Sequence, residues 1–355
     1  MSALAAALGT VAAVHEAPAA PLPEPAALHA EHARLAAQSL LIAIAAAGAR
    51  LVAVGDRGII VFSDDRGASW TQAADVPTQS LLTGVCFLDA QRGVAVGHDE
   101  VILTSADAGR TWERRHYAPE AQRPLLDVWC GPMGRSIAVG AYSAYLTSED
   151  GGASWSETAF KPAPLPKPAA NPRAVAAGAK GSIAATEEEA ARGGYHLNRI
   201  VSGEGARLYI AAEAGHLYRS DDAGRSWRTL GSPYQGSFFG VLPLDGESVL
   251  AFGLRGNLYR SEDAGASWQR IESGTVAMLD GAARLADGTV AIVGLSGVAL
   301  VSHDGGRSFA LVQQSDHAGL AAAVTAGDAR LVAVGEHGAQ LIDLGRMKAV
   351  VRSDR

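Results

Sequence analysis

Short apolar runs separated by tight turns recur along the chain from about residue 39 to its end. One repeat shows the pattern clearly, with strand-like segments at Leu81–Phe87, Gly93–Gly97, Val101–Thr104 and Trp112–Arg115. No apolar period of 3.6 residues, the mark of amphipathic helices, runs through the repeat. The pattern therefore predicts short antiparallel strands and excludes a solenoid of helices.

Two phrases define the repeat. The first, S-x-D-x-G-x-S/T-W, occurs five times and once more with a final Phe, at Ser63–Trp70, Ser105–Trp112, Ser148–Trp155, Ser220–Trp227, Ser261–Trp268 and Ser302–Phe309. The second is an apolar run that ends in Gly before a two-residue turn. It reads Leu51–Gly55, Val94–Gly97, Ile137–Gly140, Leu250–Gly253, Ala291–Gly294 and Leu331–Gly335, and a seventh copy has Ala212 in the Gly place.

The spacing of the first phrase gives the architecture. Its aromatic residues lie 42, 43, 72, 41 and 41 residues apart, so the period is about 41 and one interval carries an insertion. Four short strands per repeat of about 40 residues are typical of a propeller blade, and a closed ring of blades removes exposed sheet edges. The sequence predicts an all-β, seven-bladed β-propeller of four-stranded antiparallel blades.

The domain boundaries follow from the same count. Residues 1–38 form an N-terminal segment, and residues 39–355 form the propeller, with an insertion at about 161–194 between blades three and four. Blade seven lacks the first phrase. We expect Met347–Arg352 to supply its outermost strand, with Glu31–Gln38 as the alternative.

The first phrase, called the box here, spans the turn between the third and fourth strands. Its Asp can accept N–H groups of the turn, its Gly permits a positive φ, and its aromatic residue can wedge between sheets. We expect Trp155 to be buried between blades three and four. Recurrence around the ring favours a structural role over a catalytic one for the box aspartates, Asp65, Asp107, Asp150, Asp222, Asp263 and Asp304.

Strand order places the boxes at one end of the ring, the box side. The turns between second and third strands and the connections between blades lie at the other end, the turn side. Sequence variation, which often marks a functional face, is concentrated in the second-to-third-strand turns. Those turns are Asp56-Arg57, His98-Asp99, Ala141-Tyr142, Glu213-Ala214, Leu254-Arg255, Leu295-Ser296 and Glu336-His337.

The insertion also belongs to the turn side. Lys161–Pro172 is rich in Pro, Ala and Lys and predicts an extended linker, and Ser182–Arg192 predicts a short helix. Two interpretations stay open, a solvated loop and a lid over the mouth of the central channel.

Candidate partner-binding residues on the turn side are those that break the repeat: Arg57, His98, His196, Asn198, Glu213, Tyr234, Phe238, Phe239, Arg255 and His337. For the charged turn residues, Glu336 among them, the alternative is plain solvation. His196 and Asn198 could line the channel or satisfy inner-strand hydrogen bonds. The aromatic residues could form a binding patch or pack beneath a loop. Mixed charge with aromatic residues fits a protein surface better than a phosphate.

Composition narrows the function classes. The net charge of −7 argues against nucleic-acid binding. Two cysteines, Cys86 and Cys130, exclude a disulfide scaffold and a cysteine-ligated metal site. We expect both to be small buried residues in neighbouring inner strands rather than a bridge. No transmembrane span, metal or cofactor is expected, and we expect a monomer.

The N-terminus leaves localisation open. Ala3–Val14 is an apolar run followed by small residues at Ala17-Pro18-Ala19, like the core and cleavage region of a signal peptide. No Lys or Arg precedes Arg34, so a basic leader is missing. The protein is periplasmic or envelope-associated if exported, and cytoplasmic otherwise.

The boxes and the Gly-turn strands, together with His196–Ile200, Pro233–Gly240 and Gly253–Ser261, resemble the photosystem II stability and assembly factor family of Asp-box (BNR-like) propellers, in a proteobacterial non-photosynthetic branch. The resemblance covers about residues 39–355. It implies a non-enzymatic propeller that helps assemble or stabilise a membrane protein complex. The family's arginine patch does not map here residue by residue, because only Arg57 and Arg255 occupy matching turns.

Two functions compete. A binding or assembly propeller is favoured because no catalytic set is visible. The alternative is a sialidase-like glycoside hydrolase, since such enzymes also carry Asp boxes, but no Arg-Ile-Pro motif occurs in the chain.

Overall fold

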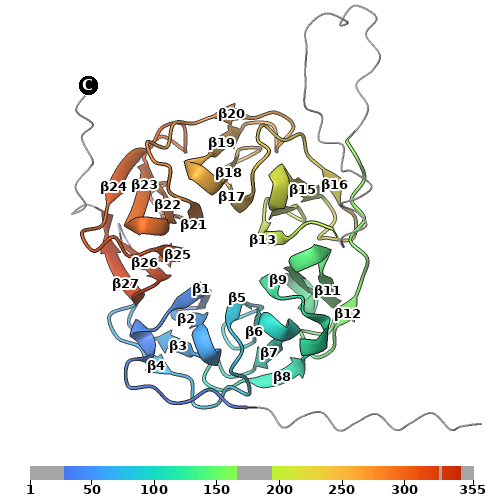
Figure 1. Ribbon diagram of the computed structural model, residues 1–355, viewed down its shortest axis with the longest axis vertical. Helices are drawn as coiled ribbons and strands as arrows, with labels where there is room; N and C mark the ends of the chain where they lie inside the picture. Colours follow the sequence, from blue (N-terminus) through green and yellow to red (C-terminus); the bar gives the residue numbers. More distant parts are fainter. Residues whose placement is uncertain (1–27, 166–193, 328–329, 345–355) are drawn as a thin grey trace, which may run out of the picture.

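Seven antiparallel sheets stand around a common axis and close into a ring (Figure 1). The computed structural model describes residues 28–165, 194–327 and 330–344. Six sheets have four strands in chain order, and the seventh has three strands within the described residues. The prediction of an all-β, seven-bladed propeller is confirmed.

Each blade uses one continuous stretch of chain, and its first strand lies nearest the axis (Figure 1). Blades one to three contain β1 (Leu41–Ala47), β2 (Arg50–Gly55), β3 (Ile60–Ser63), β4 (Thr71–Gln72), β5 (Leu82–Phe87), β6 (Gly93–Gly97), β7 (Ile102–Ser105), β8 (Glu113–His116), β9 (Leu125–Cys130), β10 (Ser136–Gly140), β11 (Tyr145–Ser148) and β12 (Ser156–Glu157). Blades four and five contain β13 (Leu197–Ser202), β14 (Leu208–Ala212), β15 (Leu217–Ser220), β16 (Arg228–Thr229), β17 (Phe238–Pro243), β18 (Val249–Gly253), β19 (Leu258–Ser261) and β20 (Gln269–Arg270). Blades six and seven contain β21 (Leu279–Arg284), β22 (Val290–Gly294), β23 (Val298–Ser302), β24 (Ala310–Gln313), β25 (Leu320–Thr325), β26 (Arg330–Gly335) and β27 (Gly338–Asp343).

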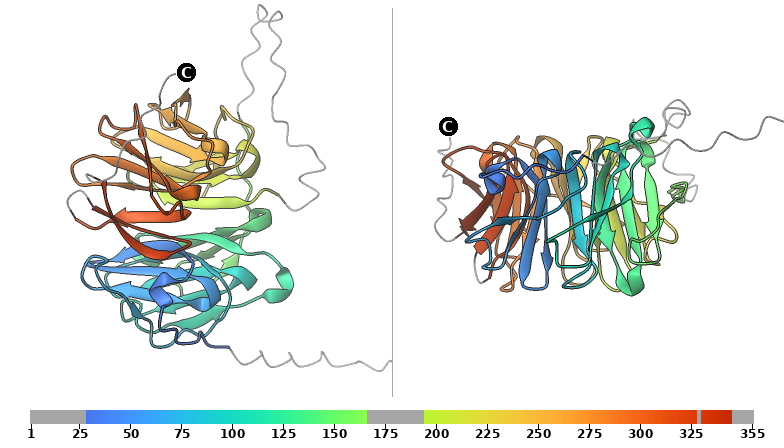
Figure 2. Two further views of the ribbon diagram at one scale, coloured as in Figure 1. Left: turned by 60° about the vertical axis from the view of Figure 1, so that its left-hand side comes forward. Right: turned by 90° about the horizontal axis from the view of Figure 1, so that it is seen from below.

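The helical elements of the described chain are single 3-10 turns. They are η1 (Ala36–Gln38), η2 (Asp56–Gly58), η3 (His98–Glu100), η4 (Pro119–Ala121), η5 (Pro132–Gly134), η6 (Ala141–Ser143), η7 (Glu213–Gly215), η8 (Leu254–Gly256) and η9 (Leu295–Gly297). Most of them form the turns between second and third strands, which lie at one end of the flat ring (Figure 2). Within the described residues, no helix is long and apolar enough to cross a membrane.

The glycine that ends each second strand is required by close packing of the backbone. A Cβ atom on Gly97 would lie 2.1 Å from the carbonyl oxygen of Leu81, the residue before the first strand of the same blade. The corresponding distances are 2.0 to 2.4 Å at Gly55, Gly140, Gly253, Gly294 and Gly335. Only blade four holds a side chain here, the fully buried methyl group of Ala212.

Apolar side chains fill the spaces between neighbouring blades. Trp112 packs between blades one and two, in a cluster with Val52 and Ile60 of blade one. Trp155 is half-buried and packs against a cluster of blades two and three that includes Val94. The expectation that Trp155 lies between blades three and four was wrong, because each box aromatic residue leans back toward the preceding blade.

The box turns are held by side-chain hydrogen bonds. The Asp65 carboxylate accepts the backbone N–H of Ser69 at 2.8 Å and its hydroxyl at 2.6 Å. The Ser63 hydroxyl donates to Asp65 at 2.8 Å and accepts the N–H of Gly67 at 2.8 Å. The same bonds recur at Asp107, Asp150, Asp222, Asp263 and Asp304. The carboxylates are therefore engaged within their own turns.

We expect these bonds to make the fold sensitive to acid. The Ser69 hydroxyl, the Ser69 amide and the Ser63 hydroxyl lower the pKa of Asp65 from its ordinary value of 3.8 to about 2. Equivalent bonds lower the pKa of Asp150 and of Asp263 to about 2. A lowered pKa stabilises the fold above the unfolded-state pKa, and this stabilisation disappears as pH falls from about 4 toward 2.

We expect the urea midpoint of unfolding to fall steeply between about pH 4 and 2. Asp150→Asn should be less stable than the wild type at pH 7, and the difference should shrink at pH 2. A constant difference between the two proteins across this range would contradict the assignment.

One disulfide joins two neighbouring blades. The sulfur atoms of Cys86 on β5 and Cys130 on β9 are bonded, with a Cα–Cα distance of 5.6 Å. The expectation of two unbridged cysteines was wrong. Cys130 is the last residue of β9 and Cys86 the last but one of β5; these inner strands pack side by side, and both cysteines are only partly buried. The bridge therefore links blades two and three at the box end of the channel wall.

The ring closes where blade seven meets blade one. Ile44 and Ala53 of blade one share an apolar cluster with Ala322 and Val332 of blade seven. The segment Glu31–Gln38 is not a strand; its last residues form η1, which packs against β27. The alternative fourth strand was thus wrong, and Met347–Arg352 lies outside the described residues. At the closure, blades seven and one meet through side-chain packing.

The start of the insertion is attached to blade four. Ala163 donates its N–H to the oxygen of Trp227 at 2.8 Å and accepts the N–H of Thr229 at 2.8 Å. Phe160 packs among Tyr145 and Trp227, with ring centroids 5.5 and 5.8 Å away. The predicted helix Ser182–Arg192 and the proposed lid lie outside the described residues.

Candidate functional site

A constant backbone frame surrounds the channel mouth on the turn side. In every blade, the first turn residue donates its N–H to the carbonyl of the residue before the first strand, at 2.9 to 3.1 Å. The donors are Asp56, His98, Ala141, Glu213, Leu254, Leu295 and Glu336. The backbone hydrogen bond of these turns is thus the same in every blade, whereas their side chains differ.

The second turn residue adopts a left-handed conformation without being glycine in blades one to six. The φ angles lie between 51° and 59° at Arg57, Asp99, Tyr142, Ala214, Arg255 and Ser296. Glycine adopts this conformation with less strain. The left-handed position of the box turns is Ala or Gly in five of six copies, and Arg66 is the exception. At the left-handed position, the turn side therefore carries larger and more polar side chains than the box side.

Four of the predicted site residues are exposed on this side. Arg57 is 84% exposed and lies 3.7 Å from Asp56. His98 and Arg255 are exposed, and His337 is 61% exposed and lies 3.3 Å from Asp316. Arg57 and Arg255 belong to blades one and five, which are not neighbours, so the structure does not bring these arginines together.

His196 and Glu213 form a local cluster beside blade three. The Glu213 carboxylate accepts the backbone N–H of His196 at 3.2 Å and lies 3.9 Å from its ring nitrogen. The imidazole meets the Tyr142 ring edge to face, with centroids 5.0 Å apart. Because its carboxylate accepts this N–H, Glu213 stabilises the backbone of the connection that enters blade four.

The remaining predicted residues lie either in the inner strands that form the channel wall or in the hydrophobic core between blades. The Asn198 amide donates to the Phe238 carbonyl at 2.8 Å, which is the satisfied inner-strand bond considered above. Phe238 is fully buried, so it is core and not part of a binding surface. Tyr234 is half-buried and stacks on Tyr259, whereas Phe239 is half-buried in the inner strand. The aromatic residues therefore do not form one exposed patch.

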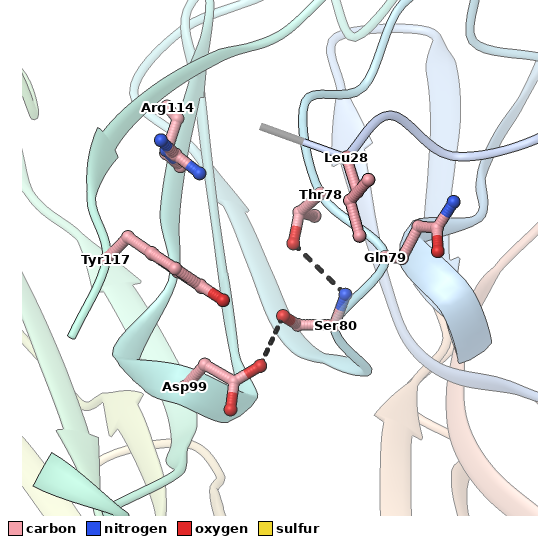
Figure 3. Close-up of a pocket in the computed structure, with 7 residues that line it drawn as sticks. All are labelled: Leu28, Thr78, Gln79, Ser80, Asp99, Arg114 and Tyr117. Carbon is pink, nitrogen blue, oxygen red and sulfur yellow. Dashed lines mark hydrogen bonds between the residues drawn. The ribbon is translucent and has the colours of Figure 1, made fainter. Parts of the chain in front are cut away.

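Two cavities lie side by side on the turn side of blades one and two. One has a volume of about 300 Å³ and is lined by Leu28, Thr78, Gln79, Ser80, Asp99, Arg114 and Tyr117 (Figure 3). Its floor is fixed by the Ser80 hydroxyl, which donates to Asp99 at 2.6 Å. The other, of about 360 Å³, shares Gln79 and is lined by Arg57.

Several exposed residues escaped the sequence-based selection. Tyr142, Leu254 and Leu295 are exposed apolar or aromatic side chains of the variable turns. Their position in those turns was the available signal. Three charged residues of the inner strands, Asp127, Arg199 and Asp280, were also missed. A charged residue within a strand that lines the axis was the sign that could have identified them.

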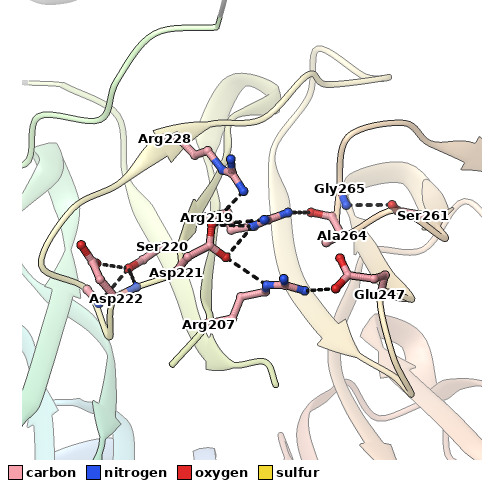
Figure 4. Close-up of polar contacts among 11 residues, drawn as sticks. Arg207, Arg219, Ser220, Asp221, Asp222, Arg228, Glu247, Ser261, Ala264 and Gly265 are labelled. Carbon is pink, nitrogen blue, oxygen red and sulfur yellow. Dashed lines mark hydrogen bonds and ion pairs between the residues drawn. The ribbon is translucent and has the colours of Figure 1, made fainter. Parts of the chain in front are cut away.

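A second charged cluster, on the box side, is used for internal contacts. Arg207, Arg219 and Arg228 surround Asp221, with nitrogen–oxygen distances of 3.1, 2.9 and 2.8 Å (Figure 4). Arg207 also binds Glu247 of blade five at 3.1 Å. These contacts lower the pKa of Asp221 against the opposing effect of burial. The cluster therefore joins blade four to blade five.

Comparison with known proteins agrees with this architecture. A family model described as photosynthesis system II assembly factor YCF48 matches residues 66–192. No match was found among curated proteins. The solved structure "YCF48 from Cyanidioschyzon merolae" is 16% identical with a TM-score of 0.63, and covers 90% of this chain and 96% of its own. The structure "YCF48 bound to D1 peptide" is 13% identical with a TM-score of 0.62, and the coverage is 90% and 97%.

The fold itself is shared more widely. The WD40 propeller domain of Doa1 is 10% identical with a TM-score of 0.61, and covers 89% of this chain and 95% of its own. At such identities the structural likeness reports the fold, so the family evidence is the match over residues 66–192. Over residues 66–192 the chain is similar to the photosynthesis system II assembly factor YCF48 family, and its fold is a seven-bladed β-propeller.

Proposed function

We propose that this protein is a non-enzymatic binding propeller that helps assemble or stabilise a protein complex, and that it docks through its turn side. The observation that carries the proposal is the constant backbone frame of the turn side, on which each blade presents a different side chain. A rigid frame with variable side chains is typical of a recognition surface.

The chemistry of this side suits a polypeptide partner. Arg57 and Arg255 supply cations, Glu336 supplies a carboxylate, and Leu254 and Leu295 are exposed apolar residues. Such a mixture fits a protein segment better than a single repeated charge would. The solved structure "YCF48 bound to D1 peptide" is a protein with a bound peptide, which supports the same class of partner for this chain. The proposed partner complex is membrane-associated, and the propeller binds it as a monomer.

The proposed place of action is the cell envelope. The Cys86–Cys130 bridge supports it, since disulfides persist in oxidising compartments and are rare in the cytosol. Fractionation of the host should therefore recover the full-length chain or its processed form outside the cytoplasm, with the bridge oxidised. Recovery in the cytosol with free thiols would contradict this part of the proposal.

Charge reversal of the two exposed turn arginines tests the docking side. Arg57→Glu combined with Arg255→Glu should reduce capture of the crosslinked partner by more than tenfold, because each change reverses a charge on the docking side. Both side chains are exposed, so the changes leave the core contacts intact. The measurement is quantitative mass spectrometry of complexes captured with a tagged chain.

Arg66→Glu provides a matched control. Arg66 is also exposed, also arginine and also left-handed, with φ 60°, but it lies on the box side. Capture should be unchanged in this variant. Equal loss in the control and the double variant, or no loss in a folded double variant, would rule out the turn side.

A further inference from the structure

Three charged side chains meet inside the ring. Asp127 lies on β9 in blade three, Arg199 on β13 in blade four and Asp280 on β21 in blade six. The Arg199 guanidinium lies 3.9 Å from the Asp127 carboxylate and 3.6 Å from that of Asp280. Because blades four and six are not neighbours, the contact with Asp280 passes in front of blade five, across the channel wall.

A cavity of about 270 Å³ adjoins this charge cluster. Arg199 and Asp280 line it near the starts of β13 and β21, and Ser202 and Pro243 line it at the box end of the inner strands. Between these ends the wall is apolar, with Val201 and side chains from blades one, five, six and seven. Its volume is near the lower end, about 300 Å³, of pockets that hold small organic ligands.

The charges in the cluster do not balance. Two carboxylates face one guanidinium. Asp127 also accepts the backbone N–H of Ile200 at 2.9 Å, whereas Arg199 is the one polar partner of the Asp280 side chain among the described residues. Burial raises the pKa of Asp280 to about 6 even though Arg199 lowers it. The Asp280 carboxylate thus retains acceptor capacity at the edge of an apolar cavity.

We propose that the channel binds an organic cation, a primary ammonium or guanidinium group on a short aliphatic stem, with the cation at Asp280 and the stem along the apolar wall. A cation supplies the missing charge and donates hydrogen bonds to the carboxylate. An anion would be repelled by the two carboxylates. A neutral ligand would leave the charge of the Asp280 carboxylate uncompensated. The cavity is lined by strand residues of the blades and by none of the exposed turn residues of the docking side proposed above.

Calorimetric titration of the full chain with pentylamine at pH 8 tests the proposal. Pentanol and pentanoate, which share the stem without the cation, should bind at least tenfold more weakly. Asp280→Asn should weaken pentylamine binding at least tenfold, because it removes the charge and keeps the shape. Asp245→Asn is the control, since Asp245 is an exposed carboxylate that is paired with Arg284 and does not line the cavity. Its affinity for pentylamine should match the wild type.

A second arm separates the two sources of such a cation. A Gly/Ser peptide with one central lysine is compared with the same peptide carrying norleucine. Binding of pentylamine alone supports a free amine, and lysine-dependent peptide binding supports a side chain of a protein partner. The proposal is overturned if pentylamine does not bind, if pentanol binds equally well, or if a folded Asp280→Asn variant retains full affinity.

Discussion

Trp112→Ala is expected to lower the free energy of unfolding by about 3–5 kcal/mol, as for the truncation of other fully packed aromatic residues. Trp112 is only 3% exposed, and it fills the space between blades one and two. Its indole N–H donates to the Gly109 carbonyl at 3.1 Å, so the variant also leaves that oxygen without its donor. Urea denaturation followed by circular dichroism measures the difference.

Trp155→Ala is the matched comparison. Trp155 occupies the same box position and donates the equivalent bond to the Gly152 carbonyl at 3.0 Å, but it is only half-buried. A smaller loss is therefore expected for this variant. If both variants lost the same free energy, or if Trp112→Ala lost less than about 1 kcal/mol, burial between blades would not be the source of the stabilisation.

Gly97→Ala is expected to destabilise the protein by at least about 3 kcal/mol or to prevent folding, at the upper limit of overpacking effects. The added methyl carbon would lie 2.1 Å from the oxygen of Leu81 and 2.9 Å from the Cα of Leu82. Both contacts are with backbone atoms, so no side-chain rotation relieves them. The amount of folded protein and its thermal midpoint are the measurements.

The chain contains the reverse experiment. Ala212 occupies the equivalent position of blade four, and its methyl group is fully buried there. Ala212→Gly should cost only about 1 kcal/mol, from the added freedom of the unfolded chain and the small lost contact. A Gly97→Ala variant as stable as Ala212→Gly would show that the close approach of the two backbones tolerates a side chain.

The repeat predicted the blades because each strand and turn depends on local sequence. An apolar run, a glycine and a box are enough to specify one hairpin after another. The neighbour of Trp155 was predicted wrongly for a different reason. A period of about 41 residues is the same in both directions around the ring, so it does not tell which adjoining blade receives the indole.

The inner strands were harder to interpret. A bulge near the start of each one adds a residue, so the alternation of faces shifts, as between Leu279 and Gly281 around Asp280. Sequence alternation alone does not reveal that Asp280 and Arg199 meet. The disulfide was missed because its cysteines lie 44 residues apart, and their closeness depends on how two blades pack.

The closure between blades seven and one has a consequence for chain connectivity. The described strands of each sheet come from one stretch of sequence, and the first and last sheets meet through side chains such as Ile44 and Val332. A circular permutant with joined ends and new termini in the connection 231–237 would keep every described sheet uncut. We therefore expect such a permutant to build the same ring, with a peptide link across the boundary of blades seven and one and a new closure between blades four and five.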